Sequence, residues 1–229
     1  MSKPKKPNAL VEIAITIVVP AVILMKLSGA TQLGPLRALL LALMFPLAWG
    51  LWDGWRRRRL NWLSVLGVIS TLLTGGIGLL QLDAQWLAVK EAAVPLAIGL
   101  AVLGSAWTRQ PLIRILVFNA DIFDVDRVHK ALAERGTEVA FETQLRQGTM
   151  LLAGTFFFSA IANYVLARWI VTSPAGTEAF NHELGRLTLL SYPVIALPSM
   201  VMMMALMFWL ARGARRLTGL ELEQMLLTG

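Results

Sequence analysis

The sequence predicts an all-α fold: a polytopic membrane helix bundle with six transmembrane helices and a small cytoplasmic amphipathic insert. Hydrophobic residues make up 56% of the 229-residue chain and charged residues only 15%, whereas soluble domains are about a quarter charged. Six apolar stretches qualify as crossings of a hydrocarbon core of about 30 Å, which needs about 20 apolar residues. The basic residues gather between alternate stretches, as they do in membrane proteins.

The six expected spans are uniformly apolar, which favours membrane helices over the alternating strands of a barrel. They cover Leu10–Leu27, Leu36–Trp55, Leu60–Leu82, Trp86–Trp107, Thr149–Val171 and Leu187–Ala211. The first lacks a small-residue cleavage site after Lys26, so we expect a retained helix rather than a signal peptide. One integral membrane domain follows, with helices one to four in residues 1–107, a cytoplasmic segment in 108–148, and helices five and six with a cytoplasmic tail in 149–229.

The distribution of Lys and Arg predicts the orientation. If both termini are cytoplasmic, sixteen of the 21 basic residues lie on the inner side, so we expect the N-in, C-in arrangement. Two arginine clusters on that side are candidate sites for anionic lipid headgroups rather than for nucleic acid. They consist of Arg56, Arg57, Arg58 and Arg59 and of Arg212, Arg215 and Arg216.

The polar insert between the fourth and fifth spans has the signals of an amphipathic helix. Asp124 can cap a helix that continues to Arg135, and Gly136 is placed to end it. Val125, Val128 and Leu132 form one apolar stripe, and a second short helix is expected around Glu138–Arg146. The insert is either a docking surface for a cytoplasmic partner or headgroups, or a connector resting on the protein's own inner face. We favour the connector.

Polar side chains at membrane depth are candidates for ligand binding or transport, because each costs on the order of 2.5–3.5 kcal/mol to insert. These candidates are Glu12, Lys26, Lys90, Glu91, Asn163 and Arg168. For Lys26 and Arg168 the alternative is snorkelling to the interface, and Glu12 is equally well an inner-interface residue.

Lys90 and Glu91 are the strongest candidates, because they are adjacent in a long apolar span. Neighbouring helix positions point about 100° apart, so we expect each to find a partner elsewhere. This predicts Glu91 facing Lys26 or Arg168, with Lys90 at the outer interface.

Prolines interrupt four spans and predict kinks, because proline frees a backbone carbonyl inside a helix. They are Pro20, Pro46, Pro95, Pro193 and Pro198. In a 3 + 3 inverted repeat the first and fourth helices correspond, and each has an acid followed by a proline, which is either a transporter feature or chance. The Thr74–Gly78 cluster favours close helix packing over phosphate binding.

The residue inventory argues against an enzyme. There is no Cys and there are only two His, and no catalytic triad, metal-protease motif or pair of carboxylates occurs in a span. We therefore expect a non-enzymatic protein with no cofactor and no metal. His182 with Glu178 and Glu183 is only a weak hint of a metal site.

The stretch from Lys90 to Trp169 resembles the intracellular septation protein A (YciB-type) family of bacterial inner-membrane proteins and its relatives. The matching residues are Lys90, Ser105-Ala106-Trp107, Pro111-Leu112-Ile113, Phe156–Phe158, Ala162-Asn163, Ala167 and Trp169. The resemblance implies a multi-pass protein of the bacterial inner membrane, with a role in cell-envelope maintenance and contacts to elongation and division machinery. It supplies no catalytic residues. The chain departs from that shorter family in the insert around Asp121–Arg146 and in its long Pro/Met-rich last helix.

Two functions are carried forward from the sequence. The first is a non-enzymatic protein of membrane homeostasis that binds lipids and membrane proteins, with self-association left open. The second is a small-molecule transporter or lipid translocator that uses the buried polar residues. A water-filled cavity lined by Glu91, Asn163 and Lys26 would favour transport, and an apolar bundle with a lipid-sized groove would favour the first.

Overall fold

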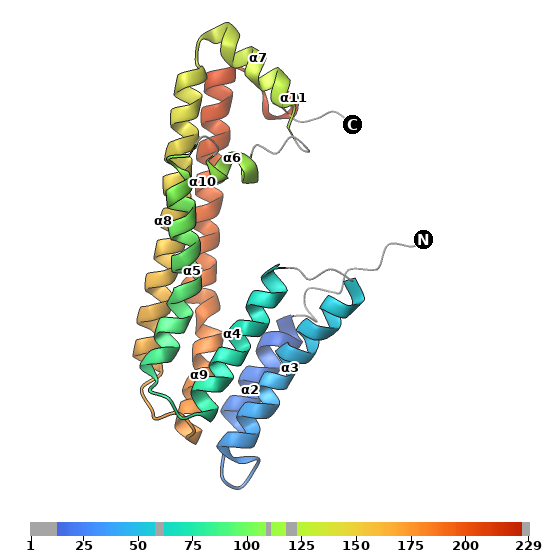
Figure 1. Cartoon of the computed structure of the whole chain (residues 1–229), viewed down its shortest axis with the longest axis vertical. Helices are drawn as coiled ribbons and strands as arrows, with labels where there is room; N and C mark the ends of the chain where they lie inside the picture. Colours follow the sequence, from blue (N-terminus) through green and yellow to red (C-terminus); the bar gives the residue numbers. More distant parts are fainter. Residues whose placement is uncertain (1–12, 58–61, 109–110, 118–122, 226–229) are drawn as a thin grey trace. The chain divides into compact units, whose positions relative to one another are not determined.

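The structure, a computed structural model, describes residues 13–57, 62–108, 111–117 and 123–225, and these form helices joined by short turns with no strand among them (Figure 1). In chain order the helices are η1 (Ala14–Val18), α2 (Val19–Lys26), α3 (Gly34–Arg57), α4 (Trp62–Leu79), α5 (Gln85–Ser105), α6 (Leu112–Val117), α7 (Val125–Arg135), α8 (Glu138–Ile170), α9 (Glu178–Ser191), η2 (Tyr192–Ala196), α10 (Leu197–Thr218) and α11 (Leu222–Met225). The all-helical prediction is confirmed for the described residues.

Four helical stretches are long and apolar enough to cross a membrane. They are Gly34–Trp52, Gln85–Ser105, Glu138–Ile170 and Glu178–Thr218. Two other apolar helices, Ala14–Lys26 and Val68–Leu79, are shorter within the part of the chain that is described. The lengths therefore indicate a membrane protein with four candidate spans, while six crossings and the N-in, C-in orientation stay predictions.

The chain divides into two compact units. The first unit contains residues 1–92 and 162–195, and the second contains 93–161 and 196–229. The divisions fall inside α5 and α8 and before the last residue of η2.

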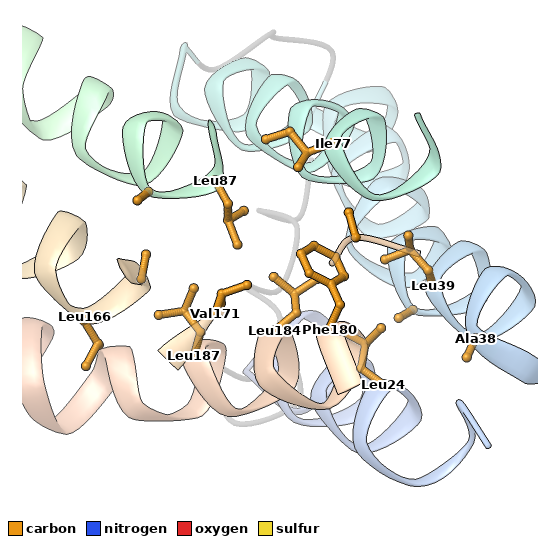
Figure 2. Close-up of a cluster of buried hydrophobic side chains, with 14 of the residues drawn as sticks. Leu24, Ala38, Leu39, Ile77, Leu87, Leu166, Val171, Phe180, Leu184 and Leu187 are labelled. Carbon is orange, nitrogen blue, oxygen red and sulfur yellow. The ribbon is translucent and has the colours of Figure 1, made fainter. Parts of the chain in front are cut away.

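The core of the first unit is built from α2, α3, α4, α5, α9 and the end of α8. Leu24, Leu39, Leu87, Phe180 and Leu184 are buried there against one another (Figure 2). Glycine lets α4 approach α3, because a Cβ on Gly78 would lie 2.5 Å from Leu39 Cδ2. The glycine cluster of α4 thus serves close packing, as the sequence predicts.

The core of the second unit contains the amphipathic insert. Val128 and Leu132 of α7 are buried in one cluster with residues of α8 and α10, including Leu145 and Leu210. Asp124 accepts a hydrogen bond from the backbone N–H of Arg127 at 3.0 Å. At the other end Gly136 takes a left-handed φ of 64°, which glycine adopts without strain.

These contacts confirm the predicted helix and favour the connector interpretation, since the apolar face of α7 packs on the unit's own helices. A further tie runs from Thr137 Oγ1 to the Leu217 carbonyl at 2.9 Å. The predicted second short helix is wrong as a separate element. Instead, α8 begins at Glu138 and continues to Ile170 without a break, because nothing in that sequence ends a helix.

The proline-containing helices differ from one another. Two five-residue π-helical segments, η1 and η2, each end two residues before a proline, Pro20 and Pro198. An i→i+5 turn accommodates the missing N–H and the ring of the proline. Pro46 and Pro95 instead lie inside α-helices. The irregular turns therefore occur in the first and last apolar helices, not in the first and fourth that an inverted repeat would pair.

Candidate functional site

Lys90 lies at the centre of a polar cluster between α5 and α4 in the first unit. Its side chain is 10% exposed, and its Nζ lies 2.7 Å from Glu91 Oε1. The ammonium also donates to Thr74 Oγ1 at 2.7 Å and to Ser70 Oγ at 3.2 Å. Each of the three ammonium protons therefore has an acceptor, and Glu91 balances the charge.

The prediction that Lys90 and Glu91 do not pair is wrong. Their Cα–Cβ directions diverge around the helix, but the long Lys90 stem lets its ammonium reach the neighbouring carboxylate. Glu91 thus has its partner within α5 rather than in Lys26 or Arg168. Lys90 is mostly buried within the protein, and its position at an outer interface stays a prediction.

The other intramembrane candidates are not brought into this cluster. The side chains of Lys26 and Arg168 are exposed and Asn163 is half-buried, and snorkelling of the two cations stays a prediction. Glu12 lies outside the described residues.

The end of α10 in the second unit holds a basic region, which we call the α10 basic site. Arg212, Arg215 and Arg216 line a cavity of about 440 Å³, together with residues up to Glu221. Arg215 Nη2 lies 2.5 Å from Glu221 Oε2. Arg212 and Arg216 have no ion pair within the described residues, so two of the three charges are uncompensated.

A fourth arginine approaches this region from the insert. Gly219 ends α10 with a left-handed φ of 69°, and a Cβ added there would lie 2.1 Å from Arg135 Nη2. The guanidinium of Arg135 in α7 therefore packs against the backbone at Gly219. Packing of α7 on α10 thus places the Arg135 cation beside the α10 basic site, although the two are far apart in the sequence.

A second cavity, of about 390 Å³, shares Arg212 and Arg216 with the first and is called here the Gln144 cavity. Its lining consists of Gln144, Trp209, Arg212, Gly213, Arg216 and Leu217. Gln144 Nε2 donates to the Leu210 carbonyl at 3.1 Å. A Cβ on Gly213 would overlap that nitrogen, so a larger residue at this position would have to displace the amide.

The first unit contains an apolar groove of about 520 Å³ between η1 and α3. It is lined by Ile15, Leu41, Met44, Phe45, Ala48, Trp49 and Trp52. The rings of Trp49 and Trp52 lie 5.3 Å apart between centroids. Neither this groove nor the two basic cavities includes Lys26, Glu91 or Asn163 in its lining.

The other predicted headgroup cluster, Arg56–Arg59, comes soon after the groove residues in the sequence. Arg56 and Arg57 end α3, while Arg58 and Arg59 lie outside the described residues. A headgroup site on these four arginines therefore stays a prediction.

Sequence reasoning missed three polar residues that the fold uses. Gln144 belongs to the segment predicted to be a second short helix, and it is part of no motif. Asn181 is fully buried and donates to Ser28 Oγ at 3.0 Å and to the Pro35 carbonyl at 2.7 Å. The third residue is Ser70, an acceptor of Lys90. It lies four residues before Thr74, so both hydroxyls share one face of an otherwise apolar helix, and this spacing is a signal that the sequence does contain.

The weak metal candidate is used differently in the structure. Glu183 accepts hydrogen bonds from the backbone N–H groups of Thr172 and Ser173, both at 2.9 Å, and from their hydroxyls. Among the described residues, no group of three His, Asp or Glu side chains could hold a metal ion. Glu183 therefore orders the turn between α8 and α9.

The chain matches no protein-family model, no curated protein and no solved structure. The resemblance to the septation protein A family accordingly rests on the sequence positions quoted above.

Proposed function

We propose that this chain is a non-enzymatic, multi-pass protein of the bacterial inner membrane that binds anionic phospholipids through the α10 basic site. The observation that carries the proposal is the pair of cavities sharing Arg212 and Arg216, neither of which is paired to an acid in the described residues. Uncompensated arginines next to a membrane attract anionic headgroups.

The surroundings of the site support a lipid over a soluble anion. The arginines directly follow the apolar stretch of α10, and Phe208 and Trp209 lie at its end. Tryptophan is enriched at membrane interfaces, where headgroups lie. Arginine is suited to phosphate because its planar fork donates two hydrogen bonds in parallel.

The test compares lipids by thermal unfolding of the full chain in neutral detergent. Anionic phospholipid should raise the melting temperature more than phosphatidylcholine, because a ligand that binds only the folded state stabilises it. Arg212→Gln with Arg216→Gln should abolish this difference. The matched control is Arg127→Gln with Lys130→Gln, which removes the same charge from exposed side chains of α7. Equal loss in both variants would show that net charge, not this site, is responsible.

The proposed cellular role is cell-envelope maintenance and membrane homeostasis, in contact with other envelope or division proteins. It is supported by the family resemblance and by the lipid-binding chemistry. A deletion strain should show envelope sensitivity to osmotic shock. The wild-type chain should restore resistance, whereas the Arg212/Arg216 double variant should not.

A lipid translocator or small-molecule transporter is the second candidate, and the Lys90–Glu91 pair in an apolar helix favours it. Charges at membrane depth mark substrate paths in transporters. If the protein translocates lipid, reconstituted vesicles should flip labelled phospholipid, and Lys90→Ala or Glu91→Ala should slow the rate. Flipping no faster than in empty vesicles would reject this function.

A further inference from the structure

The Gln144 cavity is lined by two cations and by a glutamine whose buried amide oxygen is an unpaired acceptor. Gln144 is 8% exposed, and its Nε2 is committed to the Leu210 carbonyl. Its Oε1 has no hydrogen-bond partner within the described residues. The orientation of the amide is fixed by this bond, because a flipped amide would set two oxygens against each other. A buried oxygen without a donor is costly, so a donor supplied from outside the protein would relieve that cost.

The charged residues that line the cavity indicate which kind of donor group can bind there. Arg212 and Arg216 are the charged residues of the cavity, and no carboxylate lines it. An ammonium donor would meet two guanidinium groups with no acid to offset them. A neutral hydroxyl avoids this repulsion. The site therefore favours a ligand with an anionic group for the arginines and a hydroxyl for Gln144.

We propose that the Gln144 cavity binds a phosphodiester headgroup that carries a hydroxyl, the chemistry of phosphatidylglycerol. This rests on the lipid-binding function proposed above and names its ligand class. The phosphate accepts hydrogen bonds from Arg212 and Arg216. On binding, the Gln144 amide gives up its bond to the Leu210 carbonyl and turns, so that Oε1 accepts a hydrogen bond from a headgroup hydroxyl. Trp209 and Leu217 give the cavity an apolar side for the glycerol backbone. The volume of about 390 Å³ lies within the range of small-molecule pockets, about 300–1,000 Å³.

The experiment measures lipid affinity of the full chain in neutral detergent by native mass spectrometry with three probes. Phosphatidylglycerol has both groups, phosphatidylmethanol has the same phosphodiester charge without the hydroxyl, and phosphatidylcholine has neither net charge nor hydroxyl. We expect phosphatidylglycerol to bind about fivefold more tightly than phosphatidylmethanol, the effect of one hydrogen bond. Phosphatidylmethanol should in turn bind more tightly than phosphatidylcholine.

Variants assign each preference to a residue. Gln144→Leu should make phosphatidylglycerol and phosphatidylmethanol equal while both remain bound. Arg212→Gln with Arg216→Gln should weaken both by about tenfold or more, because charge-assisted hydrogen bonds are lost. The control Arg127→Gln with Lys130→Gln should leave both affinities unchanged. If Gln144→Leu does not fold, the comparison of the two lipids on the wild-type chain still decides the proposal.

The outcomes separate this inference from the proposed function. Equal affinity of the wild-type chain for phosphatidylglycerol and phosphatidylmethanol, with both lost in the arginine variant, would overturn the hydroxyl preference and leave anionic lipid binding intact. Equal affinity for all three lipids would overturn both. Competition by soluble glycerol 3-phosphate at the concentration of the lipid would identify a free phosphate ligand and overturn the assignment to a lipid.

Discussion

The Lys90 cluster and the α10 basic site use the same kinds of charge in opposite ways. In the first unit, Lys90 is 10% exposed and surrounded by acceptors, with Glu91 2.7 Å away. In the second unit, Arg212 and Arg216 are exposed and lack an acidic partner in the described residues. A charge whose partners lie within the chain stabilises the fold, whereas a charge left without partners is available to a ligand.

The difference follows from the environment of each cation. A cation among apolar helices is costly unless it is paired and hydrogen-bonded, so the fold itself must supply acceptors for Lys90. An exposed arginine at the end of a helix is solvated and even favourable there, because cations stabilise helix C-termini. It can therefore remain unpaired until an anion binds.

The largest expected effect comes from breaking the Lys90 pair. Glu91→Leu leaves Lys90 with neutral acceptors, the hydroxyls of Ser70 and Thr74 and the Ser70 carbonyl. We expect a loss of about 2 kcal/mol of unfolding free energy, discounted because Glu91 is 30% exposed. Lys90→Met with Glu91→Leu removes both charges and should recover most of the loss. The measurement is unfolding in mixed micelles. A double variant as unstable as Glu91→Leu would contradict the comparison, because the loss of stability would then not come from an unpaired Lys90 charge.

The second effect tests how the Gln144 cavity is shaped. Gly213→Ala should cost about 1–3 kcal/mol, since the new Cβ overlaps the Gln144 amide and displaces it. The matched control is Gly154→Ala on α8 of the same unit, where a Cβ meets nothing within 4 Å. That control should be neutral or stabilise by up to about 1 kcal/mol. Thermal unfolding of both variants measures the difference between their losses of stability. Equal losses would show that the Gln144 amide does not contact Gly213.

A smaller effect concerns the insert helix that places Arg135 beside Gly219. Asp124→Ala removes the N-cap of α7 and should cost about 1 kcal/mol. Asp124→Asn keeps a capping oxygen and should cost only a fraction of that. Hydrogen exchange of the first turn of α7 distinguishes the two variants, and equal protection in both would exclude the cap as the cause.

The smallest effect on stability is expected in the α10 basic site, where we expect the largest effect on lipid binding. Arg212→Gln with Arg216→Gln should change the unfolding free energy in lipid-free detergent by no more than about 0.5 kcal/mol, as for surface substitutions generally. Thermal unfolding without lipid measures this value. A large loss of stability would mean that these arginines serve the fold, as Lys90 does, and the contrast between the two regions would fail.

Local features of the fold could be predicted from the sequence. The start and end of α7 at Asp124 and Gly136, and its buried stripe at Val128 and Leu132, depend on residues within one or two turns. The membrane character likewise depends on apolar runs that can be counted. The pairing of Lys90 with Glu91 was missed because helix position alone ignores the reach of a long side chain. The continuity of α8 does not follow from the sequence pattern, because a change from polar to apolar residues does not itself end a helix.

The sequence by itself determined that the chain is helical and apolar enough for a membrane, and where its charges cluster, because helix periodicity, caps and hydropathy act over short distances. Only the tertiary structure decided that Ser70 and Thr74 serve Lys90, that Gln144 meets Gly213 and that Arg135 reaches Gly219. These contacts join different helices, and the last two join helices distant in the chain. They depend on how closely the helices approach, which at Gly213 and Gly219 the missing side chain permits and which no linear pattern encodes.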